Sequence, residues 1–225
     1  TVPAGQMRTV IGPNGAGKST FFNLLTGYIS CNSGRILFRG KDVTGLPPHS
    51  LCRLGLGRTF QINSIFASAT VLENVQVALL AHRRRIWNMW AAADKLLVLE
   101  AEQLLTTLGL KDRAEKLGSE LSYGDRRRLE VALALACEPQ LLLLDEPTAG
   151  MSIPDKPGMV ELIRKVSRER GVTVILIEHD MDIVFSVADE ITVLHQGAVV
   201  AQGTPQEIKS NEQVQQIYLG EDADA

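Results

Sequence analysis

Residues 12–20 read GPNGAGKST and give the clearest indication of the fold: Gly12, Pro13, Asn14, Gly15, Ala16, Gly17, Lys18, Ser19 and Thr20. It matches the pattern G-x-x-x-x-G-K-[S/T], whose glycines let the backbone curl so that many N–H groups point at a phosphate. The apolar run Met7–Ile11 precedes it, and a helical pattern from about Lys18 to Tyr28 follows. This strand–loop–helix context predicts a phosphate-binding loop, in which all nine residues except Pro13 contact the ligand. Lys18 is expected to reach the β- and γ-phosphates, and the Ser19 hydroxyl to ligate Mg²⁺.

Elsewhere the sequence alternates between short apolar runs and helical patterns. Near-continuous runs of Val, Ile and Leu lie at Gln140–Leu144, Val172–Ile177 and Ile191–Leu194, and helical patterns lie at Tyr123–Cys137 and Lys156–Arg170. Strands without polar alternation are typical of parallel sheets that helices cover on both faces. We therefore predict an α/β fold that resembles P-loop NTPases and has a mostly parallel sheet as its core.

Two further regions have a different character. The stretch around Gly34–Phe38 and Val43 predicts an antiparallel hairpin. Residues 71–117 are rich in Ala, Leu, Glu and Arg at helical spacing, which indicates an inserted α-helical subdomain. We expect one domain over residues 1–225, with a nucleotide-binding core at 1–62 and 138–225 and a helical subdomain at 63–137. Because the chain begins at Thr1 amid a strand-and-turn pattern, we expect natural residues to precede it.

Composition excludes several classes of protein. The 225 residues suffice for one sizeable core, and a net charge of -3 argues against a nucleic-acid binder. No apolar run approaches the ~18–20 residues that span a bilayer, so any membrane role must come from partner subunits. Cys31, Cys52 and Cys137 are scattered and form no C-x-x-C pair, which argues against a metal or disulfide site and favours a reducing compartment.

Two carboxylates end the run Leu141–Leu144. Alone, an acidic pair after a strand is more often a helix cap or a turn. Combined with the phosphate loop, however, Asp145 is placed to hold the hydration shell of Mg²⁺ and Glu146 to polarise an attacking water. The sequence thus predicts nucleoside triphosphate hydrolysis.

Three more stretches carry a family resemblance. Leu121–Asp125, which reads LSYGD, lies upstream of the acidic strand and resembles the LSGGQ signature of ABC ATPases. Gln61, at the end of Gly57–Gln61, looks like the Q-loop glutamine of that family, and His179 looks like its switch histidine. Together with the phosphate loop and the acidic strand, these elements follow the family's order and cover nearly the whole chain.

The resemblance implies an ATPase that uses ATP and Mg²⁺. It gives catalytic roles to three residues: Gln61, Glu146 and His179. It gives contacts with the metal to Ser19 and Asp145, and to Gln61 as a second role. Ser122 and Gly124 are expected to bind the γ-phosphate held by a second subunit, although Ser122 is also a good helix N-cap in its own right.

The family resemblance also implies partners. We expect a second ABC ATPase subunit, transmembrane permease subunits and, indirectly, a periplasmic solute-binding protein. The chain would then lie on the cytoplasmic face of the plasma membrane, held there by the permeases.

The chain departs from the family pattern at several positions. Tyr123 replaces a glycine of the signature, Asp125 replaces its glutamine, and Ser152 stands where the D-loop aspartate is usual. The family also places an aromatic residue that stacks on adenine well upstream of the loop, and no aromatic residue precedes Gly12 here. Because two copies would carry the same altered elements, we expect the partner ATPase to be non-identical.

Some stretches narrow the branch of the family. Gly55–Gln61, Ile177–Met181 and Val214–Glu221 resemble ATPases of branched-chain amino-acid importers. The lipopolysaccharide-export ATPase shares the Tyr-Leu-Gly-Glu ending and remains an alternative. A soluble ABC ATPase acting on DNA or ribosomes is the other alternative, but the chain has neither a long coiled-coil insertion nor a second ATPase domain.

Two basic runs stay open to interpretation. Arg83–Arg85, followed by Ile86–Trp90, is either a solvated face beside helical core or a contact with a membrane subunit or lipid headgroups. Arg126–Arg128, after the signature, is most simply a solvated helix face.

Overall fold

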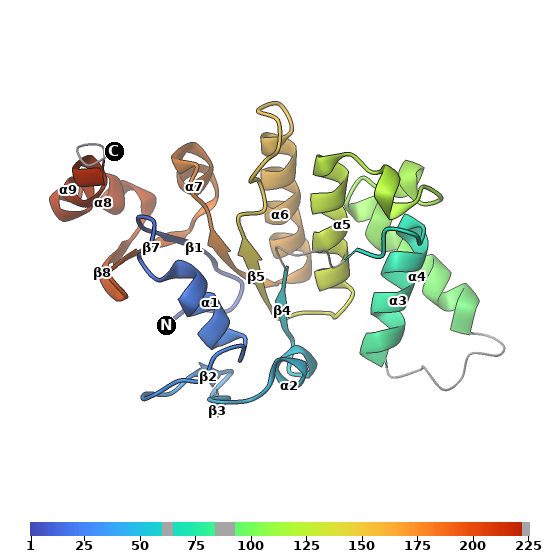
Figure 1. The fold of residues 1–225 in the computed structure, drawn as a ribbon, viewed down its shortest axis with the longest axis horizontal. Helices are drawn as coiled ribbons and strands as arrows, with labels where there is room; N and C mark the ends of the chain where they lie inside the picture. The colour runs from blue at the N-terminus through green and yellow to red at the C-terminus, as the bar shows by residue number, and fades with distance from the viewer. Residues whose placement is uncertain (60–64, 84–92, 222–225) are drawn as a thin grey trace.

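A six-stranded sheet forms the centre of the protein. The structure, a computed structural model, describes residues 1–59, 65–83 and 93–221 (Figure 1). The strands run in the spatial order β4-β5-β6-β1-β7-β8, all parallel except the antiparallel pair β7–β8. Their bounds are β1 Met7–Ile11, β4 Leu56–Arg58, β5 Leu141–Asp145, β6 Thr173–Ile177, β7 Glu190–His195 and β8 Ala198–Gly203.

Helices cover both faces of this sheet because successive strand residues point to opposite sides. On one face, Leu142 and Leu144 of β5 pack in the same core as helix α6 (Lys156–Arg170). On the other face, Leu143 shares a core with Phe22 of helix α1 (Lys18–Leu25). Figure 1 shows α6 and α7 (Met181–Val187) on the side of the sheet opposite to α1. Burial on both faces explains why these strands lack polar alternation.

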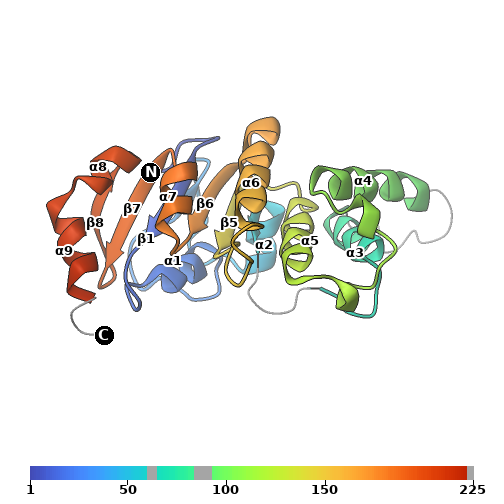
Figure 2. The same ribbon diagram turned by 90° about the horizontal axis from the view of Figure 1, so that it is seen from above.

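Further helices lie beyond the two ends of the sheet. Helices α3, α4 and α5 lie at the β4 end, and α8 and α9 at the β8 end, as Figures 1 and 2 both show. The bounds are β2 Leu37–Phe38, β3 Lys41–Asp42, α2 Pro48–Arg53, α3 Val71–Arg83, α4 Ala93–Thr107, α5 Tyr123–Leu135, α7 Met181–Val187, α8 Pro205–Lys209 and α9 Glu212–Glu221, with single 3₁₀ turns η2 at Lys111–Arg113 and η3 at Gly118–Glu120. Among the described residues, no helix combines the length and apolar character needed to cross a bilayer.

The predicted fold class is confirmed, with differences at the level of elements. Strand β1 and helix α6 have the predicted bounds. The first helix stops at Leu25 because Gly27 has a left-handed backbone, with φ of 70°. The hairpin has strands of only two residues each, joined by Arg39 and Gly40, both at positive φ. The division into a core and a helical subdomain stays an interpretation.

Candidate functional site

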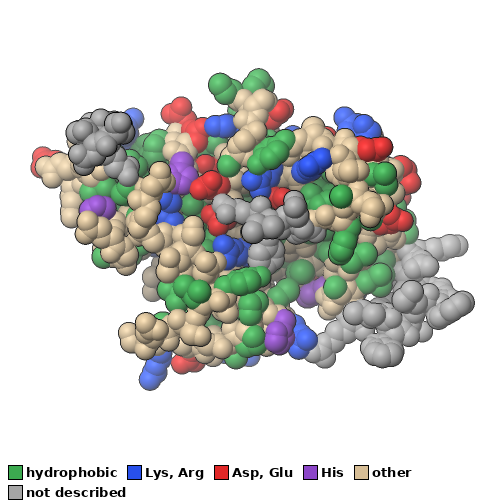
Figure 3. Space-filling model, in the orientation of Figure 1, with side chains coloured by type: hydrophobic (Ala, Val, Ile, Leu, Met, Phe, Trp, Pro, Cys, Tyr) green, Lys and Arg blue, Asp and Glu red, His purple; other side chains and the backbone are tan. Residues whose placement is uncertain are grey.

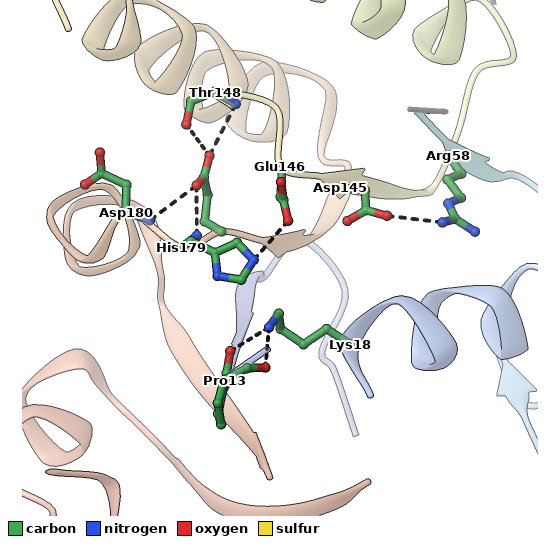
Figure 4. Close-up of polar contacts among 10 residues, drawn as sticks. Pro13, Lys18, Arg58, Asp145, Glu146, Thr148, His179 and Asp180 are labelled. Carbon is green, nitrogen blue, oxygen red and sulfur yellow. Dashed lines mark hydrogen bonds and ion pairs between the residues drawn. The ribbon is translucent and has the colours of Figure 1, made fainter. Parts of the chain in front are cut away.

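The residues of interest gather where three parallel strands end. The carboxyl ends of β1, β5 and β6 meet at one edge because these strands are adjacent and parallel. The phosphate loop follows β1, Asp145 ends β5 with Glu146 directly after it, and His179 follows β6, so their side chains converge (Figure 4). Figure 3 shows acidic, basic and histidine side chains side by side in the middle of this face. The edge therefore combines cationic and anionic groups.

The loop itself needs glycine at its first position. Gly12 has φ of 152°, and a Cβ added there would lie 2.1 Å from the carbonyl oxygen of Leu194. Helix α1 begins at Lys18 within the loop, so the N–H groups of its first turn lack partners within the helix. Such N–H groups and the helix dipole favour an anion at this point.

The side chain of Lys18 folds back onto the start of the loop. This side chain is buried, and Nζ donates hydrogen bonds to the carbonyl oxygens of Gly12 at 2.5 Å and Pro13 at 2.8 Å. Ser19 and Thr20 are exposed beside it. A cavity of about 510 Å³ adjoins the loop, lined in part by Gly15 and Gly17. The loop thus holds the ammonium group of Lys18 against its own carbonyl oxygens, and a cavity adjoins the loop at Gly15 and Gly17.

The backbone of Glu146 has an uncommon conformation. Its φ is 49°, a region that residues other than glycine rarely adopt, and its N–H donates to the carbonyl oxygen of Ile177 at 2.9 Å. This conformation brings Glu146 Oε1 to 2.9 Å from His179 Nε2 (Figure 4). Residues that follow two different strands therefore form one polar pair. Such local strain is common where a side chain must be aimed at a site.

Glu178 holds the backbone of His179 in place, a role that the sequence did not reveal. Glu178 is buried, and its Oε2 accepts hydrogen bonds from the N–H of His179 at 3.0 Å and of Asp180 at 3.5 Å. Its Oε1 accepts from the N–H of Thr148 at 3.2 Å and from the Thr148 hydroxyl. The segments that carry Glu146 and His179 are therefore fastened together. The only sequence signal was a carboxylate at the end of an apolar strand.

Asp180 begins helix α7 and forms an ion pair with α6. Its Oδ1 accepts from the N–H of Ile183 at 3.4 Å, and its Oδ2 lies 2.7 Å from Lys156 Nζ. The hydrogen bond from Lys156 holds the pKa of the Asp180 carboxyl below its ordinary value. The pair ties the start of α7 to α6 directly after His179.

Asp145 is buried and has one cationic partner. Its Oδ2 lies 3.2 Å from Nη2 of Arg58, the last residue of β4. Burial raises the pKa of the Asp145 carboxyl above its ordinary value, and the charge of Arg58 opposes that rise. The sequence contained Arg58 beside the Q-loop stretch, but no local pattern linked it to Asp145.

The signature stretch starts helix α5. Ser122 caps this helix, since its Oγ accepts from the N–H of Asp125 at 3.1 Å. In the described part of the chain, no hydrogen bond or ion pair joins Ser122 or Gly124 to the phosphate loop. Gly124 instead lies beside Met151, whose Cε would be 3.5 Å from a Cβ at position 124. The structure thus leaves Ser122 and Gly124 apart from the other predicted site residues.

The departures from the family pattern have local partners. Asp125 Oδ2 lies 3.7 Å from Arg113 Nε, and the Ser152 hydroxyl donates to Asp155 Oδ2 at 2.5 Å. The expectation of a solvated Arg126–Arg128 face is wrong for Arg127, whose side chain is 14% exposed. It pairs with Glu130 at 2.8 Å, because the helix places that carboxylate one turn away.

Two sets of predicted residues lie outside the described part of the chain. They are Gln61, with its catalytic and metal roles, and the stretch 84–90 that includes most of the first basic run.

Comparison with known proteins identifies the family. The model of the family described as ABC transporter matches residues 1–149. A second model, described as branched-chain amino acid ATP-binding cassette transporter, matches residues 198–224. The first covers the phosphate loop, the signature stretch and the acidic strand.

Individual relatives agree with these matches. The high-affinity branched-chain amino acid transport ATP-binding protein BraF of Pseudomonas aeruginosa is 40% identical over 96% of this chain and 88% of its own length. LivG of Escherichia coli, with the same description, is 39% identical over 95% of this chain and 86% of its own length. The ADP conformation of MJ1267, an ATP-binding cassette of an ABC transporter, superposes with a TM-score of 0.86 at 30% identity, covering 97% of this chain and 89% of that one. The chain belongs to the ABC transporter family, as an ATP-binding cassette that hydrolyses ATP.

Proposed function

We propose that this chain powers the import of branched-chain amino acids or similar small solutes. The observation that carries the proposal is the similarity to BraF and LivG over nearly the whole chain, together with the branched-chain family match at 198–224. The ABC ATPase itself does not select the solute. We therefore assign the substrate class from the relatives and the chemistry from the site.

The geometry supports a division of roles in ATP hydrolysis. The N–H groups at the start of α1 and the ammonium of Lys18 would hold the β- and γ-phosphates. Glu146 would orient a water and accept its proton as the water oxygen bonds to the γ-phosphorus and the bond to the ADP oxygen breaks. His179, 2.9 Å from Glu146, would fix the direction of that carboxylate. Gln61 keeps its proposed catalytic role from the family resemblance alone.

The residues present fit a magnesium ion. Mg²⁺ prefers hard oxygen ligands and is usually bound by one or two carboxylates together with substrate phosphates. The exposed Ser19 hydroxyl and the Asp145 carboxylate are such groups, and Gln61 is the third proposed ligand. When bound, the ion neutralises charge that develops on the phosphates.

We propose the partners from the family resemblance, and the position of the signature stretch supports a second ATPase subunit among them. Ser122 and Gly124 make no hydrogen bond to this chain's own phosphate loop in the described residues, which is consistent with binding the nucleotide of a second ATPase subunit. We propose that this subunit is non-identical, because Tyr123, Asp125 and Ser152 depart from the family pattern. Permease subunits would hold both at the cytoplasmic face of the plasma membrane, and a periplasmic solute-binding protein would deliver the solute.

The test is to purify the protein from native membranes with its partners and to identify the permeases. Uptake of radiolabelled leucine should then fall when Glu146→Gln replaces the natural chain, while Glu169→Gln, an exposed change on α6, serves as the control. Co-purification with a permease for an unrelated solute, or unaltered leucine uptake in the Glu146→Gln strain, would contradict the proposal.

A further inference from the structure

Arg58 connects three elements of the site through one guanidinium group. It ends strand β4, and its Nη2 lies 3.2 Å from Asp145 Oδ2 at the end of β5. Its Nη1 donates to Asn23 Oδ1 at 2.7 Å and to Thr26 Oγ1 at 3.1 Å. Asn23 belongs to α1, the helix that starts in the phosphate loop, and Thr26 caps its end. The same guanidinium therefore joins the Asp145 carboxylate to the helix that carries Lys18.

The position of this guanidinium is fixed by packing as well as by hydrogen bonds. The Arg58 side chain is 12% exposed and that of Asp145 is 3% exposed. The guanidinium carbon lies 5.6 Å from the centre of the Phe22 ring and 5.9 Å from that of the Tyr28 ring. A cation held between two rings and three oxygen acceptors has little freedom to move, so it fixes the carboxylate that it touches.

The contact engages only one oxygen of Asp145. In the described part of the chain, no hydrogen bond reaches the other oxygen, Oδ1. Figure 4 shows the Arg58 contact on one side of this carboxylate, with Lys18 and Glu146 on the other. The pair thus leaves Oδ1 available while it restrains the rotation of the group.

We propose that Arg58 is a positioning residue for the metal: by holding Oδ2 and anchoring to α1, it directs Oδ1 of Asp145 toward the ion that accompanies ATP. This inference rests on the metal role proposed above for Asp145. Groups that orient a metal ligand contribute to affinity without touching the ion, and their loss usually costs about 10–100-fold. Methionine in place of Arg58 keeps much of the side-chain volume but cannot donate a hydrogen bond to the Asp145 carboxylate.

The experiment measures how strongly a divalent ion tightens ATP binding. A fluorescent ATP analogue, mant-ATP, is titrated in EDTA and in excess Mg²⁺, in a Glu146→Gln background that slows turnover. The ratio of the two dissociation constants reports metal binding at the site, independently of activity. We expect Arg58→Met to lower this ratio by about tenfold or more, with less than about threefold change of affinity in EDTA.

Further variants separate orientation from folding. Arg58→Lys keeps the charge, and Asn23→Ala removes one anchor without changing any charge, so both are expected to fold and to lower the ratio less than Arg58→Met does. The matched control is Arg83→Met, since Arg83 pairs with Glu100 at 2.6 Å between α3 and α4. Thermal unfolding of each protein, without nucleotide, reports any purely structural role.

Asp145→Asn distinguishes the positioning role of Arg58 from the metal role of Asp145. If Arg58 acts through Asp145, Arg58→Met should have no further effect on the ratio in an Asp145→Asn background. If the ratio falls in Asp145→Asn but is unchanged in Arg58→Met, Arg58→Lys and Asn23→Ala, the positioning role of Arg58 is overturned. The metal role of Asp145 would then stand. An unchanged ratio in Asp145→Asn would overturn the metal role of Asp145 and the inference with it.

Discussion

The ring of Tyr123 lies against the α-carbon of Gly150. A Cβ built at position 150 would be 3.0 Å from Cε1, Cζ and Oη of this ring. Arg127 also holds the ring, because it donates to Oη at 2.8 Å and its guanidinium carbon lies 5.2 Å from the ring centre. The tyrosine that replaces a signature glycine therefore joins the start of α5 to the segment after Glu146 within one chain.

Replacing Gly150 by alanine should disrupt this contact. Gly150 has φ of 74°, so alanine is strained there and also meets the tyrosine ring. Gly34→Ala is the matched control, since φ is 86° and nothing lies within 4 Å of the added carbon. We expect Gly150→Ala to lower the free energy of unfolding by about 1–3 kcal/mol more than Gly34→Ala, as overpacking does. Urea denaturation measures both. Equal losses, or no recovery on adding Tyr123→Ala, would show that the ring does not restrict position 150.

Glu146→Gln should separate binding from turnover. Glutamine keeps the shape and much of the hydrogen bonding of Glu146 but cannot accept a proton from water. Turnover should fall about 10²–10⁴-fold, the usual contribution of a positioned acid–base group, while ATP still binds. Phosphate release and mant-ATP binding measure the two effects. Near-normal hydrolysis would show that Glu146 is not the base.

Lys18→Ala should act on affinity itself. The ammonium that now donates to Gly12 and Pro13 is proposed to meet the phosphates, and hydrogen bonds between charged groups contribute about 1.5–3 kcal/mol. ATP should therefore bind about tenfold more weakly or worse. Lys165→Ala, on the exposed face of α6, is the control. An unchanged dissociation constant would contradict the phosphate-loop assignment.

Cys52 should react with alkylating agents at an unusually low pH. The hydrogen bond from the Cys137 thiol lowers the pKa of Cys52 to about 6, with help from the charge of Arg53. Because the thiolate is the nucleophile, iodoacetamide labelling of Cys52 should rise with pH through about 6. Peptide mass spectrometry follows each cysteine separately. In Cys137→Ala protein the midpoint should move up toward the ordinary thiol value of about 8.5. Identical pH profiles for Cys52 in the two proteins would contradict the assignment.

The non-identical partner is tested by mass in solution. An ABC ATPase pair places a signature and a D-loop from each chain at the site of the other, and Ser152 lacks the charge of an aspartate at that position. We expect Glu146→Gln protein with Mg-ATP to remain monomeric and the natural chain alone to hydrolyse ATP slowly. Light scattering at micromolar concentration measures the mass. A tight homodimer would favour a symmetric motor instead.

Local patterns in the sequence are enough to predict the chemistry of the loop and the order of the main elements. GPNGAGKST predicts a phosphate-binding loop by local pattern, because its glycines and the start of a helix can be read from neighbouring residues. The apolar run before Asp145 and Glu146 likewise predicts a buried parallel strand. The family resemblance added His179 to the predicted site residues. In the structure its Nε2 lies 2.9 Å from Glu146 Oε1. No periodicity or motif, however, indicated what Glu178 or Arg58 contacts.

These long-range contacts depend on the tertiary structure. Arg58 and Asp145 are 87 positions apart, and Thr148 and Glu178 are 30 apart. They meet because β4 lies beside β5 and β5 beside β6. Cys52 and Cys137, which look unrelated in the sequence, become neighbours for the same reason. Cys52 precedes β4 and Cys137 precedes β5, and these two strands are adjacent. Strand order depends on the packing of the whole core rather than on local pattern, so a single sequence reveals which groups the protein has, and the folded sheet decides which of them touch.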